Sequence, residues 1–486
     1  MKTSSVLLRG VCASALALAT GCTVGPNYRV PDEALINSKT ANGAFISGGD
    51  SAVTATDLPA NWWRLYDDPT LDTLIDAALS ANTDLRMAGA ALARSNALLS
   101  EVRTLRQPGI PIEAGIEYGQ TAGEQYLLRV KPPRNTGYEA KVVVGYDLDL
   151  FGAIRRGIEA ATADYESVAA ARDLVRVNVV AETARAYANV CGSGIELSTA
   201  RRSILLQQQS LELTQRLQKA GRATDLDVTR SRQLVEQLTS TVPALESGQR
   251  NALYRLTTLT GRTPKEFDQA VATCASPPRL RQPIPVGDGA LLLKRRPDLR
   301  RAERLLAAAT AEIGVATAQL YPDITLGISF GSIGAKRDFL TPPTNFWDLG
   351  SLVKWQANQS AARARIAAAR AGAQLALANF DGTVLESLRE IETALSTYVH
   401  DLQREEILRA GRDDAGKAAA DAQRLQVGGR ATQIVVIDAQ RTLAAAEQSL
   451  AQIQTAIAGD QIAVFLALGG GWEAEGTGPA PAPSTK

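Results

Sequence analysis

The chain has 486 residues, of which 52 are Lys or Arg and 51 are Asp or Glu, so its net charge at pH 7 is +1. A charge this close to neutral argues against nucleic acid or another polyanion as the partner. Aromatic residues make up only 5% of the chain, which is low for one compact core and typical of long Ala-rich helices packed in thin layers.

Residues 1–21 have the pattern of a secretory signal peptide. Lys2 and Arg9 supply the positive start, the apolar stretch VCASALALAT follows, and a small residue precedes Cys22. About ten apolar residues are too few to span a bilayer. The segment Ala-Thr-Gly-Cys resembles the bacterial lipobox, so we expect Cys22 to be acylated, and Thr23 after it favours the outer membrane. A plain signal peptide followed by a chance Cys is the alternative.

The first half of the chain then contains two stretches whose side chains alternate like those of a lipid-facing strand. In residues 112–118, IEAGIEY, apolar side chains alternate with Glu113 and Glu117. Residues 138–150, YEAKVVVGYDLDL, supply a second strand, and a polar loop with prolines around residues 131–136 separates the two. The pattern predicts a strand pair.

A long helical hairpin is predicted next, because residues 134–242 contain no proline. The nonapeptide RLQKAGRAT, residues 216–224, places Gly221 and Arg222 where the chain turns back, and Gly supplies the positive φ that a helix stop requires. We expect each arm of the hairpin to run about 60 residues, roughly 90 Å at the helical rise.

Two cysteines remain after the signal peptide and Cys22 are set aside. They are Cys191 and Cys274, and an exported protein lies in an oxidising compartment where a disulfide is permitted. Cys191 lies 30 residues before Gly221 on the descending arm, and the segment after Gly261 is long enough to fold back against it. A Cys191–Cys274 bridge is therefore a prediction, and two buried free thiols are the alternative.

The second half of the chain repeats the first. The nonapeptide RLQVGGRAT, residues 424–432, matches RLQKAGRAT at seven of nine positions, and Gly428 and Gly429 stand at its turn. Residues 324–330, ITLGISF, and 345–355, NFWDLGSLVKW, form a second alternating pair. Apolar residues in two heptad seams flank the turn: Val384, Leu388, Ile391, Leu395, Tyr398, Leu402, and Val436, Ala439, Leu443, Ala446, Leu450, Ile453, Ile457.

A long-period repeat is an architectural feature. It divides the chain into a signal peptide (1–21), an N-terminal segment (22–65), two repeats (66–275 and 276–472) and a disordered tail (473–486). The first repeat contains a strand pair at 110–150 and a hairpin at 154–260. The second contains a helix at 298–320, a strand pair at 322–355 and a hairpin at 360–468.

Four strands are too few for a membrane barrel. Closure takes about eight or more strands, and an open sheet edge does not survive in lipid. If these strands lie in a membrane, several chains must pool them, and three chains would supply twelve.

Residues suited to catalysis or metal binding are sparse. The single histidine, His400, lies inside a heptad run and is expected to be a solvated helix residue. The pairs Asp147/Asp149 and Asp225/Asp227 could suggest acid–base chemistry, but the first lies in a predicted strand with both carboxylates on its polar face. No metal-spaced Cys or His set, nucleophile elbow or phosphate loop is present in the sequence. We therefore expect no enzyme, no cofactor and no metal.

Several long motifs, in order, resemble the outer-membrane efflux protein family, in particular its TolC/OprM-like group and the lipidated NodT-type branch. They are CTVGPNYRVP, NWWRLYDDPTLDTLI, YDLDLFGAIRR, RRPDLRRAERLLAAATAEIGVATAQLYPDITL and LALGGGW. A departure is VKWQANQSAARARI, residues 353–366, where the family usually shows a Phe-Asp-Gly-Gly-like turn. The resemblance implies a mixed α+β membrane protein: a homotrimer with a twelve-stranded outer-membrane β-barrel continuous with a periplasmic α-helical barrel.

The same resemblance implies a function and partners. Members are exit ducts for an inner-membrane pump, here expected to be proton-driven, joined by a periplasmic adaptor and embedded in outer-membrane lipid. Alternatives left open are a duct for type I polypeptide secretion and a structural envelope lipoprotein without a pore. The lipidated start with GPNY favours the small-molecule duct over polypeptide secretion, and the alternating strands disfavour the poreless lipoprotein.

The resemblance also implies a gate at the hairpin turns, where charged residues hold the resting duct closed. The matching positions in this chain are Asp227, Arg430 and Asp438, while Val435 stands where the family can carry another acidic residue. The alternative is that these charges, with Arg222, only cap and solvate helix ends.

Overall fold

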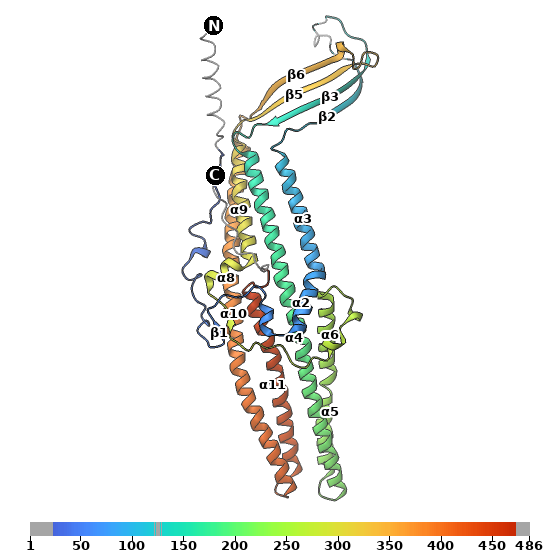
Figure 1. Cartoon of the computed structure of the whole chain (residues 1–486), viewed down its shortest axis with the longest axis vertical. Coiled ribbons are helices and arrows are strands. Elements are labelled where there is room, and N and C mark those ends of the chain that lie inside the picture. Colours follow the sequence, from blue (N-terminus) through green and yellow to red (C-terminus); the bar gives the residue numbers. More distant parts are fainter. Residues whose placement is uncertain (1–22, 121, 123–126, 128, 473–486) are drawn as a thin grey trace. The chain divides into compact units, whose positions relative to one another are not determined.

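A computed structural model describes residues 23–120, 122, 127 and 129–472 of the chain. Cys22 and the predicted signal peptide lie outside the described residues, as does the predicted tail at 473–486. The described chain is mostly helical, with one larger sheet (Figure 1).

The chain forms two compact units, and each is built from pieces of both sequence repeats. The first unit combines the N-terminal segment up to Pro31 with residues 92–168 and 301–380. The second combines residues 32–91, 169–300 and the chain from Asp381 onward. The predicted repeats are therefore not separate globules, because strands from both repeats bond into one sheet.

The sheet of the first unit has the order β2-β3-β5-β6, and every neighbouring pair is antiparallel. Its strands are β2 (Ile112–Gly119), β3 (Asn135–Asp147), β5 (Asp323–Ala335) and β6 (Asn345–Lys354). All four strands predicted from alternation are confirmed. The structure ends β3 at Asp147, so Leu148 to Leu150 are not strand residues, and it extends β5 beyond the predicted end at Phe330.

Two helices of very similar length follow strands of this sheet in the chain, α4 (Ala153–Lys219) after β3 and α10 (Ser360–Val427) after β6, with 67 and 68 residues. After each turn the chain returns in shorter helices, α5 (Asp225–Thr239) and α6 (Val242–Leu259) in the first repeat and α11 (Gln433–Ala467) in the second. The predicted arm length of about 60 residues is therefore wrong for both returning arms. Pro243 in the first turn of α6 has no backbone N–H to continue α5, so a new helix begins there.

The remaining elements are short or flank the sheet. They are η1 (Leu35–Asn37), β1 (Val53–Thr54), η2 (Trp62–Tyr66), α2 (Pro69–Ala81), α3 (Thr83–Thr104), η4 (Pro264–Glu266), α7 (Gln269–Ala272), β4 (Ile284–Pro285), α8 (Gly289–Arg295), α9 (Pro297–Ala318) and η5 (Pro342–Thr344). Strands β1 and β4 pair in parallel, a contact between distant segments that local alternation did not indicate.

The core of the second unit lies where η2 and α2 pack on α4, α10 and α11. The heptad prediction is confirmed there, since Ile391, Leu395 and Ile457 are fully buried. Trp62 stacks on Phe465 at 4.4 Å between ring centroids. By length and composition α11 is apolar enough to cross a membrane, but 56% of the relevant window is buried inside the protein.

The motif ending LALGGGW turns back onto this core. Gly469 and Gly471 have φ of +69° and +102°, and a Cβ on Gly470 would meet Leu58 Cδ2 at 2.5 Å. Close packing against the NWW motif therefore requires glycine at these positions.

Candidate functional site

The register of the four strands collects most of their apolar residues on one face of the sheet. Ile112 is opposite Val142, Val142 is opposite Phe330, and Phe330 is opposite Trp347. Directly paired residues share a face, and every second residue along a strand joins them. The apolar members of this face are Ile112, Ala114, Ile116, Tyr118, Tyr138, Ala140, Val142, Val144, Tyr146, Ile324, Leu326, Ile328, Phe330, Trp347, Leu349 and Val353.

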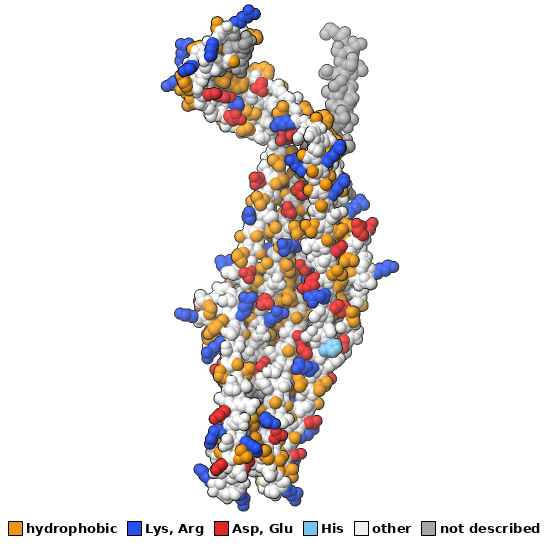
Figure 2. Space-filling view, turned by 180° about the vertical axis from the view of Figure 1, so that it is seen from behind, with side chains coloured by type: hydrophobic (Ala, Val, Ile, Leu, Met, Phe, Trp, Pro, Cys, Tyr) orange, Lys and Arg blue, Asp and Glu red, His pale blue; other side chains and the backbone are white. Residues whose placement is uncertain are grey.

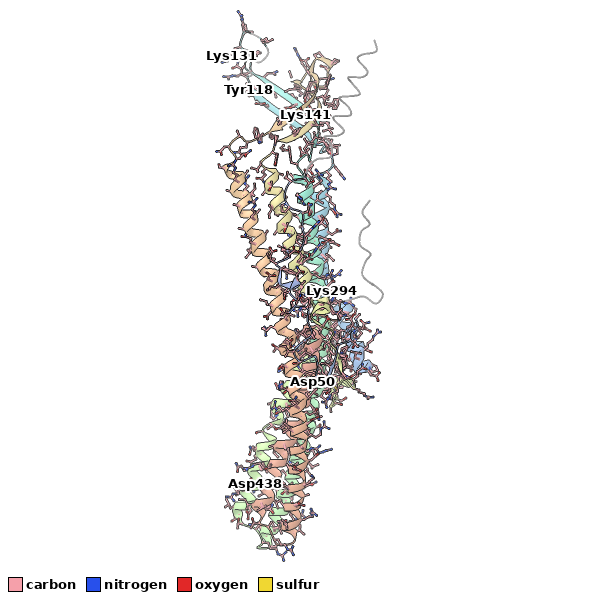
Figure 3. The ribbon with its side chains drawn as sticks, turned by 90° about the vertical axis from the view of Figure 1, so that its left-hand side faces the viewer. Asp50, Tyr118, Lys131, Lys141, Lys294 and Asp438 are labelled. Carbon is pink, nitrogen blue, oxygen red and sulfur yellow. A yellow bond between two sulfur atoms is a disulfide. The ribbon has the colours of Figure 1, made fainter. Side chains whose placement is uncertain are left out.

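Many of these side chains are solvent-exposed in the single chain: Ile112 is 76% exposed, Leu349 72% and Trp347 71%. A contiguous apolar surface of this kind marks contact with lipid or another protein. Tyr118 is also 71% exposed and lies with Lys141 on the sheet (Figure 3). Aromatic residues at the rim of an apolar band are typical of outer-membrane strands.

The opposite face of the sheet carries the charged side chains, together with the apolar residues Val143, Ile333, Phe346 and Leu352. Lys141 lies 3.0 Å from Glu113 and 3.2 Å from Glu139. Thr325 donates a hydrogen bond to Asp147 at 2.7 Å, and Ser329 donates one to Asp348. This alternation of an apolar and a charged face matches a barrel with lipid outside and water inside.

The two edge strands, β2 and β6, each have a neighbour on one side only. Their outer rows of backbone N–H and C=O groups therefore have no partner within this sheet. In a bilayer each such group would cost several kcal/mol, so the sheet requires other strands to close it.

The twin nonapeptides form the same turn twice. Gly221 and Gly429 have φ of +71° and +70°, and the next residue in each turn, Arg222 or Arg430, donates its N–H at 2.8 Å to the carbonyl five residues earlier. This 6→1 bond with a left-handed glycine is the Schellman motif. The prediction of a hairpin bend is confirmed at both turns, although Gly428, unlike Gly429, does not have a positive φ. Figure 2 shows Lys and Arg side chains at this end of the helices, with Asp and Glu side chains above them.

The structure does not bring the three predicted gate residues together within one chain. Asp227 completes a capping box with Thr224, accepting its backbone N–H at 2.9 Å and its hydroxyl at 2.8 Å. Asp438, labelled in Figure 3, pairs with Arg441 at 2.5 Å. The Arg430 guanidinium has no ion pair with either carboxylate among the described residues.

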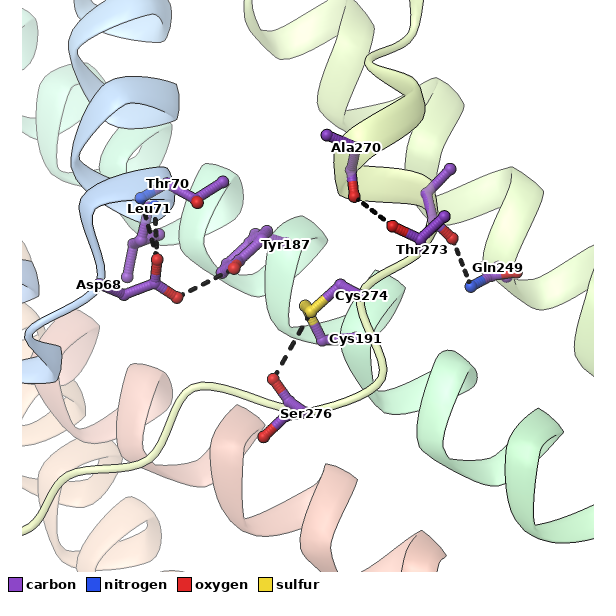
Figure 4. The surroundings of a disulfide bond; sticks show 11 residues. Asp68, Thr70, Leu71, Tyr187, Cys191, Gln249, Ala270, Thr273, Cys274 and Ser276 are labelled. Carbon is purple, nitrogen blue, oxygen red and sulfur yellow. Dashed lines mark hydrogen bonds between the residues drawn. A yellow bond between two sulfur atoms is a disulfide. The ribbon is translucent and has the colours of Figure 1, made fainter.

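The structure joins Cys191 and Cys274 in a disulfide with a Cα–Cα distance of 4.7 Å (Figure 4). Cys191 is fully buried on α4, and Cys274 follows α7. A Cβ on Gly194 would lie 1.9 Å from the Cys274 carbonyl oxygen, so the glycine permits this close approach. Nearby, the Tyr187 hydroxyl donates to Asp68 at 2.9 Å, and Asp68 also caps α2 (Figure 4).

The carboxylates of Asp401 on α10 and Asp460 on α11 lie close together. Burial, the charge of Asp401 and a hydrogen bond with Asp401 raise the pKa of Asp460 to about 6. Arg404 lies 3.9 Å from Asp401. Asp460 also lines a cavity of about 580 Å³ bordered by α4, α10 and α11.

This pair predicts a pH-dependent stability. The pKa of Asp460 is about 6 in the folded protein against an ordinary aspartate pKa of 3.8, so the folded state holds the proton more tightly than the unfolded state. The free energy of unfolding should fall as pH rises from about 4 to about 6, because in that range the unfolded state has lost the Asp460 proton that the folded state still holds. Above about pH 6 the destabilisation by the ionised carboxylate should be complete. An Asp460→Asn variant should therefore melt at a higher temperature than the parent at pH 7.5 and show little difference at pH 4. Asp438→Asn, at an exposed site, is the control, and equal Asp460→Asn gains at both pH values would contradict the assignment.

The other carboxylates and the histidine have structural positions. His400 is exposed, with Nδ1 2.7 Å from the Ser396 carbonyl oxygen. The predicted strand position of Asp149 is wrong: the residue lies after β3 and accepts the N–H groups of Ile154 and Arg155, so it caps α4. Residues 23–120, 122, 127 and 129–472 contain no cluster of three or more His, Cys, Asp or Glu suited to a metal ion.

Sequence reasoning missed two buried arginines. Arg296 bridges Asp298 at 2.6 Å and Glu390 at 2.7 Å, and it donates to the Ala467 carbonyl at 2.7 Å. Arg156 binds the N-terminal segment through several hydrogen bonds. Each is the second residue of an Arg-Arg pair, Arg296 in the motif RRPDLRR and Arg156 in FGAIRR. The sequence alone does not distinguish which arginine of a pair is buried.

Comparison with known proteins agrees with these surfaces. The model of the outer membrane efflux protein family matches residues 74–262 and 290–470. Nodulation protein T of Rhizobium leguminosarum bv. trifolii is 27% identical over 468 residues, covering 94% of this chain and 96% of the relative. The solvent efflux pump outer membrane protein SrpC of Pseudomonas putida is 27% identical over 474 residues, covering 94% and 97%.

Among solved structures, the outer-membrane channel OprN is 32% identical, with a TM-score of 0.86, covering 93% of this chain and all of that one. The family model and the OprN match both extend over the strand pairs and the helical hairpins. The chain therefore belongs to the outer membrane efflux protein family.

Proposed function

We propose that this protein is the outer-membrane exit duct of a tripartite efflux system that exports small molecules. The observation that carries the proposal is the sheet, which has one apolar exposed face, one charged face and two open edges. Three chains supply twelve strands, so the edges close without any unpaired backbone row in the lipid.

The helical hairpins supply the periplasmic part of the duct in this proposal. Their narrow apolar seams are suited to packing side by side, and their six turns in a trimer would form the inner mouth. Relatives such as the solvent efflux pump protein SrpC support a pump partner. On this basis the turns face a periplasmic adaptor and an inner-membrane pump, and the duct carries solute passively without a catalytic step.

Cys22 is proposed as the lipid-bearing first residue of the mature chain. The lipobox-like Ala-Thr-Gly-Cys segment supports this assignment. Firm anchoring usually takes two signals, and here the barrel would be the second.

The charged residues at the turns are proposed to close the resting duct through contacts between chains. Arg430 is the candidate donor because its guanidinium makes no ion pair with Asp227 or Asp438 in the chain, while Asp438 is exposed and Asp227 is half-buried. One exposed ion pair is worth only ~0–1 kcal/mol, but three symmetry-related copies act on the same ring.

Single-channel recordings in planar bilayers test both the duct and the gate. We expect the parent protein to conduct, Asp227→Ala and Arg430→Ala to raise its conductance, and Asp438→Ala to weaken its preference for cations. Thr224→Val is the control for Asp227, because it breaks the same capping box without removing charge. Equal effects of Thr224→Val and Asp227→Ala would show that helix capping matters and the charge does not. A purified trimer that never conducts would contradict the duct itself.

A further inference from the structure

The N-terminal segment just after Cys22 is held by a buried arginine. Arg156 on α4 is only 2% exposed. Its Nε donates to the Val24 carbonyl at 3.1 Å, and its Nη2 donates to the Gly25 carbonyl at 3.1 Å and to Asn27 Oδ1 at 2.8 Å. Its Nη1 donates to Glu159 at 2.6 Å, which keeps the guanidinium charge balanced. A planar donor fork with fixed geometry is suited to several simultaneous acceptors.

Backbone packing fixes the same segment from the other side. Gly25 has φ of +86°, and a Cβ on it would lie 2.4 Å from the Gly314 Cα on α9. A Cβ on Gly314 would in turn lie 2.7 Å from Arg156 Cγ. The two glycines therefore allow the segment, α9 and the arginine side chain to meet at van der Waals distance.

Further along, Tyr28 anchors the segment to α9. Its hydroxyl donates to Glu303 Oε1 at 2.8 Å, and the Arg304 guanidinium lies 5.6 Å from its ring centroid. Arg304 also pairs with Glu166 on α4 at 3.0 Å. The segment is thus tied to both α4 and α9 over residues 24–28.

At its start, the segment reaches the junction between the sheet and the helices. The Val24 N–H donates to the Phe151 carbonyl at 3.2 Å, and Gly152, with φ of +81°, would place a Cβ 2.7 Å from Thr23 Cγ2. Phe151 stacks on Tyr321 at 4.4 Å between centroids. Phe151 follows β3 and Tyr321 precedes β5, so Thr23 lies where the apolar face of the sheet begins.

We propose that Arg156 is a positioning residue that sets where the lipid anchor enters the membrane relative to the barrel. This inference rests on the proposed acylation of Cys22. We define the clasp as Arg156, Gly314 and their contacts with Val24, Gly25 and Asn27. Consecutive Cα atoms are about 3.8 Å apart, so while the clasp holds Val24 the anchor, two residues earlier, cannot reach another level. Without the clasp, residues 23–31 could extend by roughly 30 Å at about 3.3–3.6 Å per residue. The clasp therefore holds the acyl chains level with the end of the apolar face that lies nearest the helices.

The clasp also predicts where Arg29 lies. Arg29 is exposed and follows Tyr28, which is bonded to Glu303. Glu303 precedes Gly314 by eleven residues of α9, about 16 Å along the helix axis. A probe at residue 29 should thus lie well away from the bilayer while the clasp holds, and approach the lipid when it is released.

A fluorescence experiment on the acylated trimer in lipid nanodiscs tests this geometry. Arg29→Cys is labelled with bimane, and the discs contain lipids with a nitroxide on the headgroup. We expect weak quenching with the clasp intact and several-fold stronger quenching in Arg156→Ala. Gly25→Val, which breaks the clasp from the other side, should give the same increase. Arg156→Lys should lie between, because an ammonium keeps the charge but loses the planar fork.

Two controls make the result specific. Arg365→Ala removes an equally charged side chain that instead donates to Gln319 at 2.8 Å, and it should leave quenching unchanged. An unacylated Cys22→Ala form, exported with a signal peptide that does not direct acylation, should stay weakly quenched even with Arg156→Ala. The mass of the mature N-terminal peptide verifies acylation in each sample.

Unchanged quenching in both Arg156→Ala and Gly25→Val would overturn the proposal, as would an equal increase in the unacylated form. Conductance of the same samples in planar bilayers reports separately on the duct. Conducting trimers with unchanged quenching would refute the clasp alone, whereas the absence of conductance in every sample would refute the proposed function.

Discussion

Replacing Val142 by Arg will prevent stable assembly of the protein in the outer membrane. Val142 lies near the middle of β3, between Ile112 and Phe330 on the apolar face of the sheet. An Arg on the lipid face of a barrel costs about 2–4 kcal/mol near the midplane of the bilayer, and a trimer carries the cost three times. We expect little or no trimer in detergent extracts of the outer membrane.

The neighbouring residue supplies a matched control. Val143 is also a half-buried valine of β3, but it is opposite Ser329 on the polar face, whose hydroxyl donates to Asp348. Val143→Arg therefore adds the same charge on the water side, beside a carboxylate, and should assemble normally. Loss of trimer in Val143→Arg alone would show that the faces have been assigned the wrong way round. Equal yields of trimer from the two variants would show that the two faces do not separate lipid from water.

Removing the Cys191–Cys274 bridge should destabilise the second unit strongly. The bond closes a loop with a sequence separation of 83 residues and holds the segment after α6 against α4. A bridge across a loop of this size contributes about 2–4 kcal/mol, mainly by restricting the unfolded chain. We expect the Cys191→Ala, Cys274→Ala double variant to melt at a clearly lower temperature than the oxidised parent.

The control is the parent protein, treated with a reductant before the melting experiment. Because the reduced parent and the double variant both lack the bond, they should have the same melting temperature. Gly194→Val should also lower the melting temperature, because its side chain would collide with the Cys274 carbonyl. If both thiols can be alkylated in unfolded protein that has not been treated with a reductant, the bridge does not form.

Features set by local periodicity were predictable from the sequence. Alternation of apolar and polar residues is a property of a single strand, so all four strands were found, and their shared face followed once the register was known. The twin nonapeptides predicted both turns, because a left-handed glycine is required at Gly221 and Gly429 wherever this bend occurs. The heptad seams predicted the buried residues of α10 and α11 for the same reason.

Features set by contacts between distant segments were not predictable. The parallel pair β1 and β4 joins residues 231 positions apart at Val53 and Ile284, a separation that no local pattern reveals. The side chain of Asp149 continues the polar alternation of β3 in the sequence, yet the strand ends first and the carboxylate caps α4. The role of Arg156 depends on a segment more than 120 residues earlier in the chain.

The most direct test of the central claim is the mass of the protein extracted from outer membranes in mild detergent. The open edges of β2 and β6 require strands from other chains, and twelve strands require three copies. Native mass spectrometry should therefore find a trimer of the mature chain that persists on dilution. A folded monomer that is stable in detergent, with its four-stranded sheet intact, would contradict the account.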